Sequence, residues 1–157
     1  MIISLNWLKQ YFSQGAYPGV KELTELIGAR LVEIEGVTDL APYYQSAVVA
    51  RVVDCKEHTD SDHLHVCRID DGGVIKDVPR DDDGMVQVVC GAPNVRTGLK
   101  VIWLPPGSIV PASYGAKDEL KLSSRKLRGV ISYGMLASPY ELKLWHDQEG
   151  ILEVDDD

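Results

Sequence analysis

The first apolar positions of the chain recur at helical spacing. Leu5, Leu8 and Phe12 lie three and four residues apart, which places them on one face of a helix. Ser4 precedes them, and a serine hydroxyl at that position can accept a backbone N–H of the first turn. We therefore predict a short, capped amphipathic helix that ends at Gly15.

A second helical stripe and an alternating segment follow Pro18–Gly19. Val20, Leu23 and Ile27 keep the helical spacing. Residues 31–37, LVEIEGV, alternate apolar and acidic side chains with the period of a β-strand. Two helices and one strand cannot enclose a core. We therefore expect residues 1–38 to form an incomplete α+β domain, a helix-helix-strand segment that docks on the next domain or on chain beyond this sequence.

From residue 47 the chain changes to short apolar stretches separated by Gly, Pro and Asp. The stretches are AVVARVVDC (47–55), HLHVCRI (63–69), MVQVVC (85–90) and KVIWL (100–104), and a less regular basic stretch follows. About five short strands, with a brief helical turn near PNVRTG (93–98), predict a mainly β fold, a small and partly closed antiparallel barrel. Residues 70–84, between the second and third strands, predict an extended and solvated loop.

Length and composition fit one ordinary domain with an appended piece. The 157 residues are 45% hydrophobic and 25% charged, values typical of soluble globular proteins. No apolar run approaches the roughly 20 residues of a membrane span, and the N-terminus lacks the layout of a signal peptide. We therefore expect a cytoplasmic protein without membrane contact. Three cysteines are an odd number, which favours reduced thiols over a disulfide framework.

The charge of the chain is acidic overall and unevenly distributed. Its 16 Lys and Arg against 24 Asp and Glu give a formal charge of −8, which argues against a surface that binds nucleic acid everywhere. Residues 70–84 hold six aspartates against Lys76 and Arg80, whereas residues 115–130 hold five basic residues against two acidic ones. Nucleic-acid binding, if the chain has it, is therefore expected to be local.

The densest group of potential metal ligands is CKEHTDSDHLHVC, residues 55–67. His63, His65 and Cys67 would share one face of a strand by the two-residue period. Cys55 and His58 could approach from the preceding strand. Such a set could supply a tetrahedral zinc site, which keeps a metal-dependent enzyme as an alternative hypothesis. The aspartates of the 70–84 loop lack the spacing of an EF-hand calcium site.

Three stretches, taken together and in this order, resemble a known family. They are DSDHLHVCRIDDG (60–72), VVCGAPNVRTGLKV (88–101) and KLSSRKLRGVISYGMLAS (121–138). They closely resemble the tRNA-binding OB domain of the bacterial phenylalanyl-tRNA synthetase β subunit and of several tRNA-binding accessory proteins. The opening, ISLNWLKQYF and ELTELIGARLVEIEGV, resembles the β subunit specifically. The resemblance implies a five-stranded OB-fold barrel at residues 39–151, with residues 152–157 starting the return to the domain that residues 1–38 begin.

The same resemblance disfavours the zinc site. The family fills these positions with residues such as Lys and Arg, which cannot ligate a metal. We therefore expect no metal here, with Cys55 and Cys67 as small, buried or half-buried apolar residues. His58 is then expected in a loop, and His63 and His65 are expected as exposed strand residues.

OB barrels bind oligonucleotides with cations along the phosphates and flat side chains against the bases. The candidate phosphate contacts are Lys121, Arg125, Lys126, Arg128, Arg96 and Lys100. Asn94 and Ser132 are candidate neutral hydrogen-bonding groups, and Tyr133 is the candidate stacking residue, whereas Trp103 is expected in the core. The glycines of RGVISYGM (128–135) are expected to permit a bulge or a close backbone approach. The alternative for the basic stretch is a solvated face that balances an acidic protein.

No catalytic motif such as GxxxxGK[ST] or GxSxG is present. The resemblance implies a non-catalytic N-terminal fragment of the phenylalanine-tRNA ligase β chain, which contributes a tRNA-binding module to ATP-dependent charging of tRNA. It implies as partners tRNA, the remainder of the β chain, and the α subunit in a heterotetramer of two α and two β chains. ATP and Mg²⁺ would act in the parent complex, with no cofactor in these residues. The alternative hypothesis is a structural assembly module with weak or vestigial RNA binding.

Overall fold

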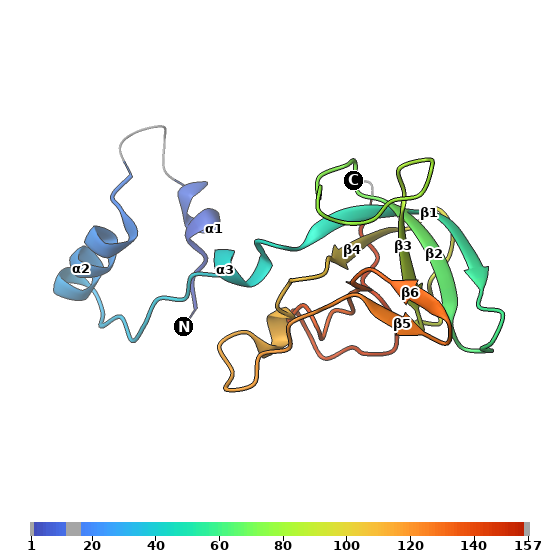
Figure 1. Cartoon of the computed structure of the whole chain (residues 1–157). Helices are drawn as coiled ribbons and strands as arrows, with labels where there is room; N and C mark the ends of the chain where they lie inside the picture. Colours follow the sequence, from blue (N-terminus) through green and yellow to red (C-terminus); the bar gives the residue numbers. More distant parts are fainter. Residues whose placement is uncertain (1, 12–16, 156–157) are drawn as a thin grey trace. The chain divides into compact units, whose positions relative to one another are not determined.

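A computed structural model describes residues 2–11 and 17–155 of the chain (Figure 1). The chain divides into two compact units, Met1–Asp39 and Leu40–Asp157. Among the described residues, no helix combines the length and the apolar character that crossing a lipid bilayer requires.

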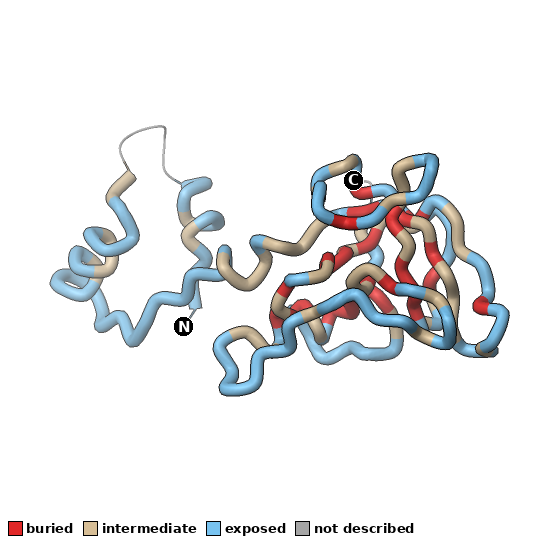
Figure 2. The backbone as a smooth tube through the Cα atoms, in the orientation of Figure 1, coloured by how far each residue is buried: buried red, intermediate tan, exposed pale blue. Residues whose placement is uncertain are grey.

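In the described residues of the N-terminal unit there are two helices, α1 (Leu5–Lys9) and α2 (Val20–Arg30). The Ser4 hydroxyl accepts the backbone N–H of Trp7 at 3.4 Å, which confirms the predicted cap of α1. The predicted end of that helix involves Phe12 and Gly15, which lie outside the described residues. None of the described residues of this unit is buried (Figure 2), as expected of a segment that cannot enclose a core.

The strand predicted at residues 31–37 is not found. Residues 32–40 belong to no helix or strand. A strand needs a neighbouring strand to bond its backbone N–H and C=O groups, and the rest of the described unit consists of helices and their connections. The apolar members of the alternation are exposed, Val32 and Val37 at 58% each. The strand prediction was wrong because an alternating pattern does not supply a pairing partner.

The C-terminal unit is built on a five-stranded antiparallel sheet with strand order β3-β2-β1-β4-β7. The strands are β1 (Val48–Glu57), β2 (His65–Asp70), β3 (Val86–Cys90), β4 (Lys100–Leu104) and β7 (Met135–Leu136). A hairpin of β5 (Arg125–Leu127) and β6 (Val130–Ser132) contacts β3. There, the Tyr133 N–H donates to the Gln87 carbonyl at 3.0 Å. The sheet nearly closes into a barrel (Figure 1), which confirms the predicted mainly β, OB-like fold.

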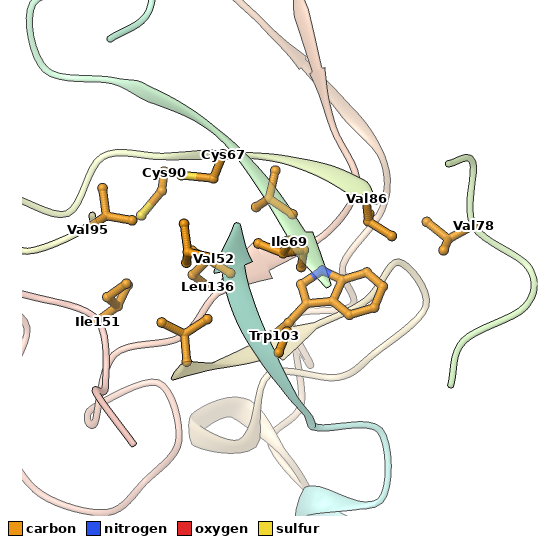
Figure 3. Close-up of a cluster of buried hydrophobic side chains, with 13 residues drawn as sticks. Val52, Cys67, Ile69, Val78, Val86, Cys90, Val95, Trp103, Leu136 and Ile151 are labelled. Carbon is orange, nitrogen blue, oxygen red and sulfur yellow. The ribbon is translucent and has the colours of Figure 1, made fainter. Parts of the chain in front are cut away.

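The core lies inside this barrel and is formed by the inward side chains of each strand (Figure 3). Val52 of β1 and Ile69 of β2 have no exposed surface. Trp103 of β4 is also fully buried, and its Nε1 donates to the Tyr133 carbonyl at 2.9 Å. Trp103 is therefore a core residue, as predicted. One bulge interrupts β1 between Val52 and Asp54.

Two short helical elements that were not predicted belong to this unit, α3 (Ala41–Tyr44) and the 3₁₀ helix η1 (Pro111–Ser113). The helical turn predicted at residues 93–98 is only a hydrogen-bonded turn, in which the Val95 N–H donates to the Ala92 carbonyl at 3.3 Å. Gly98 has a φ of +95°, a left-handed backbone conformation that cannot continue a right-handed helix. Its N–H donates to the Val52 carbonyl at 2.8 Å instead of to a local carbonyl.

The acidic loop, residues 70–84, is anchored to the barrel. The Asp71 side chain has no exposed surface, and its two oxygens accept the Arg80 guanidinium at 2.8 and 3.0 Å. Val78 of the same loop is only 7% exposed and belongs to the core cluster (Figure 3). Most of the loop is exposed and residues 71–84 contain no helix or strand, as predicted, but the anchoring of Asp71 and Val78 was not. A buried carboxylate is stable only when it is paired, and the partner of Asp71 lies nine residues along the chain.

Candidate nucleic-acid interface

The basic hairpin, residues 121–130, consists of β5, the start of β6 and the segment that leads into them. Leu127 pairs with Val130, so Arg128 and Gly129 form a two-residue turn. Both turn residues have positive φ, 42° and 94°. This is the pattern of a type I′ turn, whose twist matches that of the two strands it joins. The turn places Arg128 at the tip of the hairpin.

Four of the predicted cations gather on the basic hairpin: Lys121, Arg125, Lys126 and Arg128. All four are exposed. Within the described part of the chain, no ion pair joins any of them to a carboxylate. Arg128 Nη1 donates to the Asp60 carbonyl at 3.3 Å. The hairpin therefore presents a group of positive charges that an acidic ligand can reach.

His58 holds the hairpin against the β1–β2 loop, a role that the sequence did not suggest. The residue is 3% exposed, with Nε2 3.2 Å from the Leu127 carbonyl oxygen. Its Nδ1 accepts the Asp60 N–H at 3.0 Å. Because a carbonyl only accepts, both hydrogen bonds require the neutral ring with its proton on Nε2. The imidazole thereby fixes the strand residue that precedes Arg128.

Replacing Arg128 by asparagine is expected to leave the free energy of unfolding unchanged or to raise it by up to about 1 kcal/mol, because asparagine tolerates positive φ better than arginine. The φ of Arg128 is 42°. Urea denaturation of the 157-residue chain measures the difference. Arg125→Asn is the control, because Arg125 lies in a strand, and it should bring no gain. A clear loss of stability in Arg128→Asn alone would contradict this expectation.

Arg96 and Asn94 lie after β3 and contact the C-terminal segment. Arg96 Nη1 and Nη2 each lie 2.9 Å from a carboxylate oxygen of Glu153, and the hydrogen bond from Arg96 lowers the pKa of Glu153. The Asn94 amide donates to the Ile151 carbonyl at 2.9 Å and accepts the Ile151 N–H at 3.0 Å. Lys100 begins β4 and is half-buried. The structure thus joins two of these three predicted residues, Arg96 and Asn94, to the C-terminal segment.

Ser132 and Tyr133 help to close the barrel. Ser132 is 3% exposed, and its hydroxyl accepts the Val89 N–H and donates to the Gly134 carbonyl, both at 2.9 Å. The Tyr133 side chain is half-buried and packs against the barrel core. The structure therefore assigns the hydroxyl of Ser132 to a strand contact and leaves part of the Tyr133 ring accessible.

Arg68 is a charged residue on the barrel that sequence reasoning missed. It alternates along β2 with the fully buried Cys67 and Ile69, so its side chain points outward. Its Nε lies 2.6 Å from Asp81 Oδ2, and its Nη2 lies 2.6 Å from Asp83 Oδ2. The hydrogen bonds to Asp81 and Asp83 raise the pKa of Arg68, so the guanidinium stays charged. The alternation of β2 was the only sequence signal for this position.

The cysteines and histidines of residues 55–67 are dispersed. Cys55 and Cys67 are cross-strand partners with sulfurs 3.7 Å apart, and Cys67 is fully buried while Cys55 is half-buried, as predicted. Burial raises the pKa of the Cys67 thiol. The predicted exposure of His63 is confirmed, but this residue lies in the loop before β2. The predicted strand position of His65 is confirmed, but this residue is half-buried. In the described part of the chain, no group of three or more His, Cys, Asp or Glu could hold a metal ion.

The chain is similar to curated proteins that share one description, the phenylalanine–tRNA ligase beta subunit. It is 37% identical over 155 residues to that of Paramagnetospirillum magneticum, covering 99% of this chain and 17% of that protein. It is 36% identical over 154 residues to that of Rhodospirillum rubrum, covering 98% and 17%. It is 37% identical over 143 residues to that of Listeria innocua, covering 90% and 16%. The chain therefore spans less than a fifth of the length of these relatives.

Among solved structures, an RNA ligase mutant of Naegleria gruberi with AMP and Mn matches with a TM-score of 0.46 and 13% identity, over 68% of this chain and 32% of that chain. This level of likeness carries no functional argument.

A family model covers most of the C-terminal unit. The model described as "Putative tRNA binding domain" matches residues 47–157. The match includes every strand of the barrel, the acidic loop and the basic hairpin. Since it extends over more than half of the chain, this chain belongs to the tRNA-binding domain family.

Proposed function

We propose that the chain is the tRNA-binding module of a phenylalanine-tRNA ligase β chain and that the basic hairpin contacts tRNA phosphates. The observation that carries this proposal is the group of four exposed hairpin cations without a carboxylate partner among the described residues. Membership of the tRNA-binding domain family supports the same function.

The shape of the hairpin suits this role. Arg125 begins β5, and Arg128 lies three residues further on, in the two-residue turn. A guanidinium can form two parallel hydrogen bonds to phosphate oxygens. The His58 contact to the Leu127 carbonyl and the turn geometry hold the hairpin before RNA arrives, so little conformational entropy is lost on binding. The chain as a whole carries a charge of −8, so attraction to RNA has to come from this local group.

The wider assignment of the protein follows from the relatives. We propose that the whole protein is the β chain of the ligase, that it assembles with an α subunit in a heterotetramer of two α and two β chains, and that it works in the cytoplasm. The similarity over 99% of this chain to a protein described as a phenylalanine–tRNA ligase beta subunit supports this. ATP and Mg²⁺ would serve the charging reaction of the parent complex, and no step of that reaction is assigned to the residues described above.

Removing both hairpin arginines tests the proposed function. For about four phosphate contacts, the logarithm of tRNA affinity should fall with the logarithm of salt concentration at a slope of roughly −3. The double variant Arg125→Ala/Arg128→Ala should bind tRNA more weakly, with a slope of roughly −1.5, because two contacts are lost. Filter binding of the 157-residue chain to a phenylalanine-accepting tRNA, at several salt concentrations, measures both quantities.

The control removes two cations outside the hairpin. Lys21 and Lys76 are exposed, and Lys21→Ala/Lys76→Ala changes the net charge by the same two units. That variant should keep the slope of the wild-type chain. An unchanged slope in the arginine variant would refute the proposed contact and would favour the assembly module with weak or vestigial RNA binding.

A further inference from the structure

The outward face of the barrel carries a row of side chains that runs from β2 toward the basic hairpin. Arg68 of β2 pairs across the strands with Gln87 of β3. The Gln87 side-chain amide donates to the Ile131 carbonyl of β6 at 2.7 Å. Ile131 in turn is the cross-strand partner of Lys126 on β5. Arg68 is therefore connected through Gln87 to the separate two-stranded sheet of the hairpin, with only β3 between β2 and β6.

Arg68 is covered by the acidic loop in this structure. Two carboxylates, those of Asp81 and Asp83, each contact a different guanidinium nitrogen at 2.6 Å. The Arg68 side chain remains 33% exposed, and that of Asp83 is 75% exposed. Two oxygens in front of two guanidinium N–H groups reproduce the contact that a phosphate group makes with arginine. The carboxylates thus occupy the positions that two phosphate oxygens would take.

The acidic loop holds these carboxylates in place before any ligand binds. The pair of the buried Asp71 and the half-buried Arg80 joins the start of the loop to its last third, and Arg80 Nη1 also donates to the Gly84 carbonyl at 2.8 Å. Asp81 Oδ1 accepts the N–H of Asp83 at 3.0 Å and of Met85 at 2.9 Å. These bonds orient the second oxygen of Asp81 toward Arg68. An intramolecular partner held this way has a high effective concentration.

We propose that Arg68 is a further phosphate contact of the RNA site and that Asp81 and Asp83 occupy it in the unbound chain, so that the acidic loop competes with RNA for this arginine. The inference rests on the proposed function, because it extends the same site from the basic hairpin across β3 to β2. RNA has to displace two carboxylates to reach Arg68. The loop therefore lowers the affinity for RNA by more than the general repulsion from its negative charge would.

The test compares two double variants that remove the same negative charge from the same loop. Asp81→Asn/Asp83→Asn uncovers Arg68, and the asparagine at 81 can still accept the two backbone N–H groups. Asp77→Asn/Asp82→Asn is the matched control, because both aspartates are exposed and neither forms an ion pair with a described residue. Both variants reduce general repulsion of RNA, but only the first frees the guanidinium.

The first variant should bind a phenylalanine-accepting tRNA about five-fold more tightly than the control variant, and its salt slope should be steeper by roughly 0.7, the value for one additional phosphate contact. Adding Arg68→Ala to each variant should abolish that advantage. Asp83→Asn alone should show part of the gain, and it leaves the hydrogen bonds of Asp81 intact, so it also serves if the double variant folds poorly.

The possible failures are distinguishable. Equal affinity and equal slope in the two double variants would overturn the role of Arg68 while leaving the effect of Arg125→Ala/Arg128→Ala intact. An advantage that survives Arg68→Ala would overturn it as well. If neither the wild-type chain nor any variant binds tRNA, the proposed function fails and this inference fails with it.

Discussion

Replacing Gly134 by alanine should destabilise the barrel by about 3–5 kcal/mol, through the combined cost of overpacking and of a left-handed backbone. A Cβ at this position would lie 2.1 Å from the Leu104 carbonyl oxygen, 2.8 Å from Trp103 Nε1 and 3.0 Å from Pro105 Cα. Its φ is +83°. Two of these three atoms belong to the backbone, and the third belongs to a fully buried ring, so none can move aside at low cost. The close backbone approach expected of a glycine in this stretch is found here.

Urea denaturation of the 157-residue chain measures this loss, followed by tryptophan fluorescence, to which the buried Trp103 contributes together with the exposed Trp7 and Trp145. Gly129→Ala is the matched control. Gly129 also has a positive φ, +94°, but a Cβ there would meet no atom within 4 Å. It should therefore cost only the backbone strain, about 1–2 kcal/mol. Similar losses in the two variants would show that the contact with Leu104 and Trp103 is not what requires glycine at 134.

Replacing Asp71 by asparagine should lower the free energy of unfolding by roughly 2–4 kcal/mol at pH 7, because it leaves the Arg80 guanidinium without its charged partner. Asp71 has no exposed side-chain surface, and its oxygens also accept the N–H groups of Gly73 and Ile75 at 3.0 Å each. Arg80 is 21% exposed on its side chain, so water compensates only part of the loss. Asp82→Asn, an exposed aspartate of the same loop, should change stability by less than about 0.5 kcal/mol.

The Asp71 carboxylate should also make the free energy of unfolding depend on pH. Burial by itself would raise the pKa of Asp71, but the hydrogen bonds from Arg80, Ile75 and Gly73 outweigh it and lower this pKa to about 2. A carboxyl whose pKa is lower in the folded chain than in the unfolded chain stabilises the fold above its unfolded value, 3.8. That contribution is lost as the pH falls from 3.8 towards 2.

Denaturation curves at pH 7, 4 and 2.5 would measure this dependence. The wild-type chain should lose more stability across the acidic range than Asp71→Asn, because the variant has no carboxyl to protonate at this position. Asp82→Asn should follow the wild-type chain. Parallel pH profiles for wild type and Asp71→Asn would contradict the assignment of acid sensitivity to this buried pair.

Much of the fold was predictable because its signals are local. The alternation of apolar and polar residues in β1 to β4 follows from the two-residue period of a strand that is buried on one side. The structure buries Val52, Ile69 and Trp103 accordingly. The cap of α1 and the gathering of Arg125, Lys126 and Arg128 in one basic stretch were equally local, whereas the hairpin that this stretch forms was not predicted. The strand expected at 31–37 failed because pairing requires a second segment, which the described N-terminal unit does not provide.

The candidate site was less predictable, since its state depends on contacts between distant residues. Arg96 meets Glu153 across 57 positions of the chain, so a cation that looked available from sequence is paired in the fold. The Ser132 hydroxyl already accepts the Val89 N–H, 43 positions away in the chain. Arg68 and His58 were missed because nothing near them in the sequence indicates their partners. Only the return of the acidic loop and of the basic hairpin brings their partners within hydrogen-bonding distance.

By itself, the sequence determined the first four strands of the barrel, where the positive charges gather and which family the motifs resemble, because those properties belong to runs of neighbouring residues. The tertiary structure decided which of the charged side chains are neutralised and which stay accessible. Whether Arg68 faces water or Asp81 depends on how a fifteen-residue loop folds around the buried pair of Asp71 and Arg80. That path is set by burial and pairing energies between residues far apart in the chain, and no local pattern encodes it.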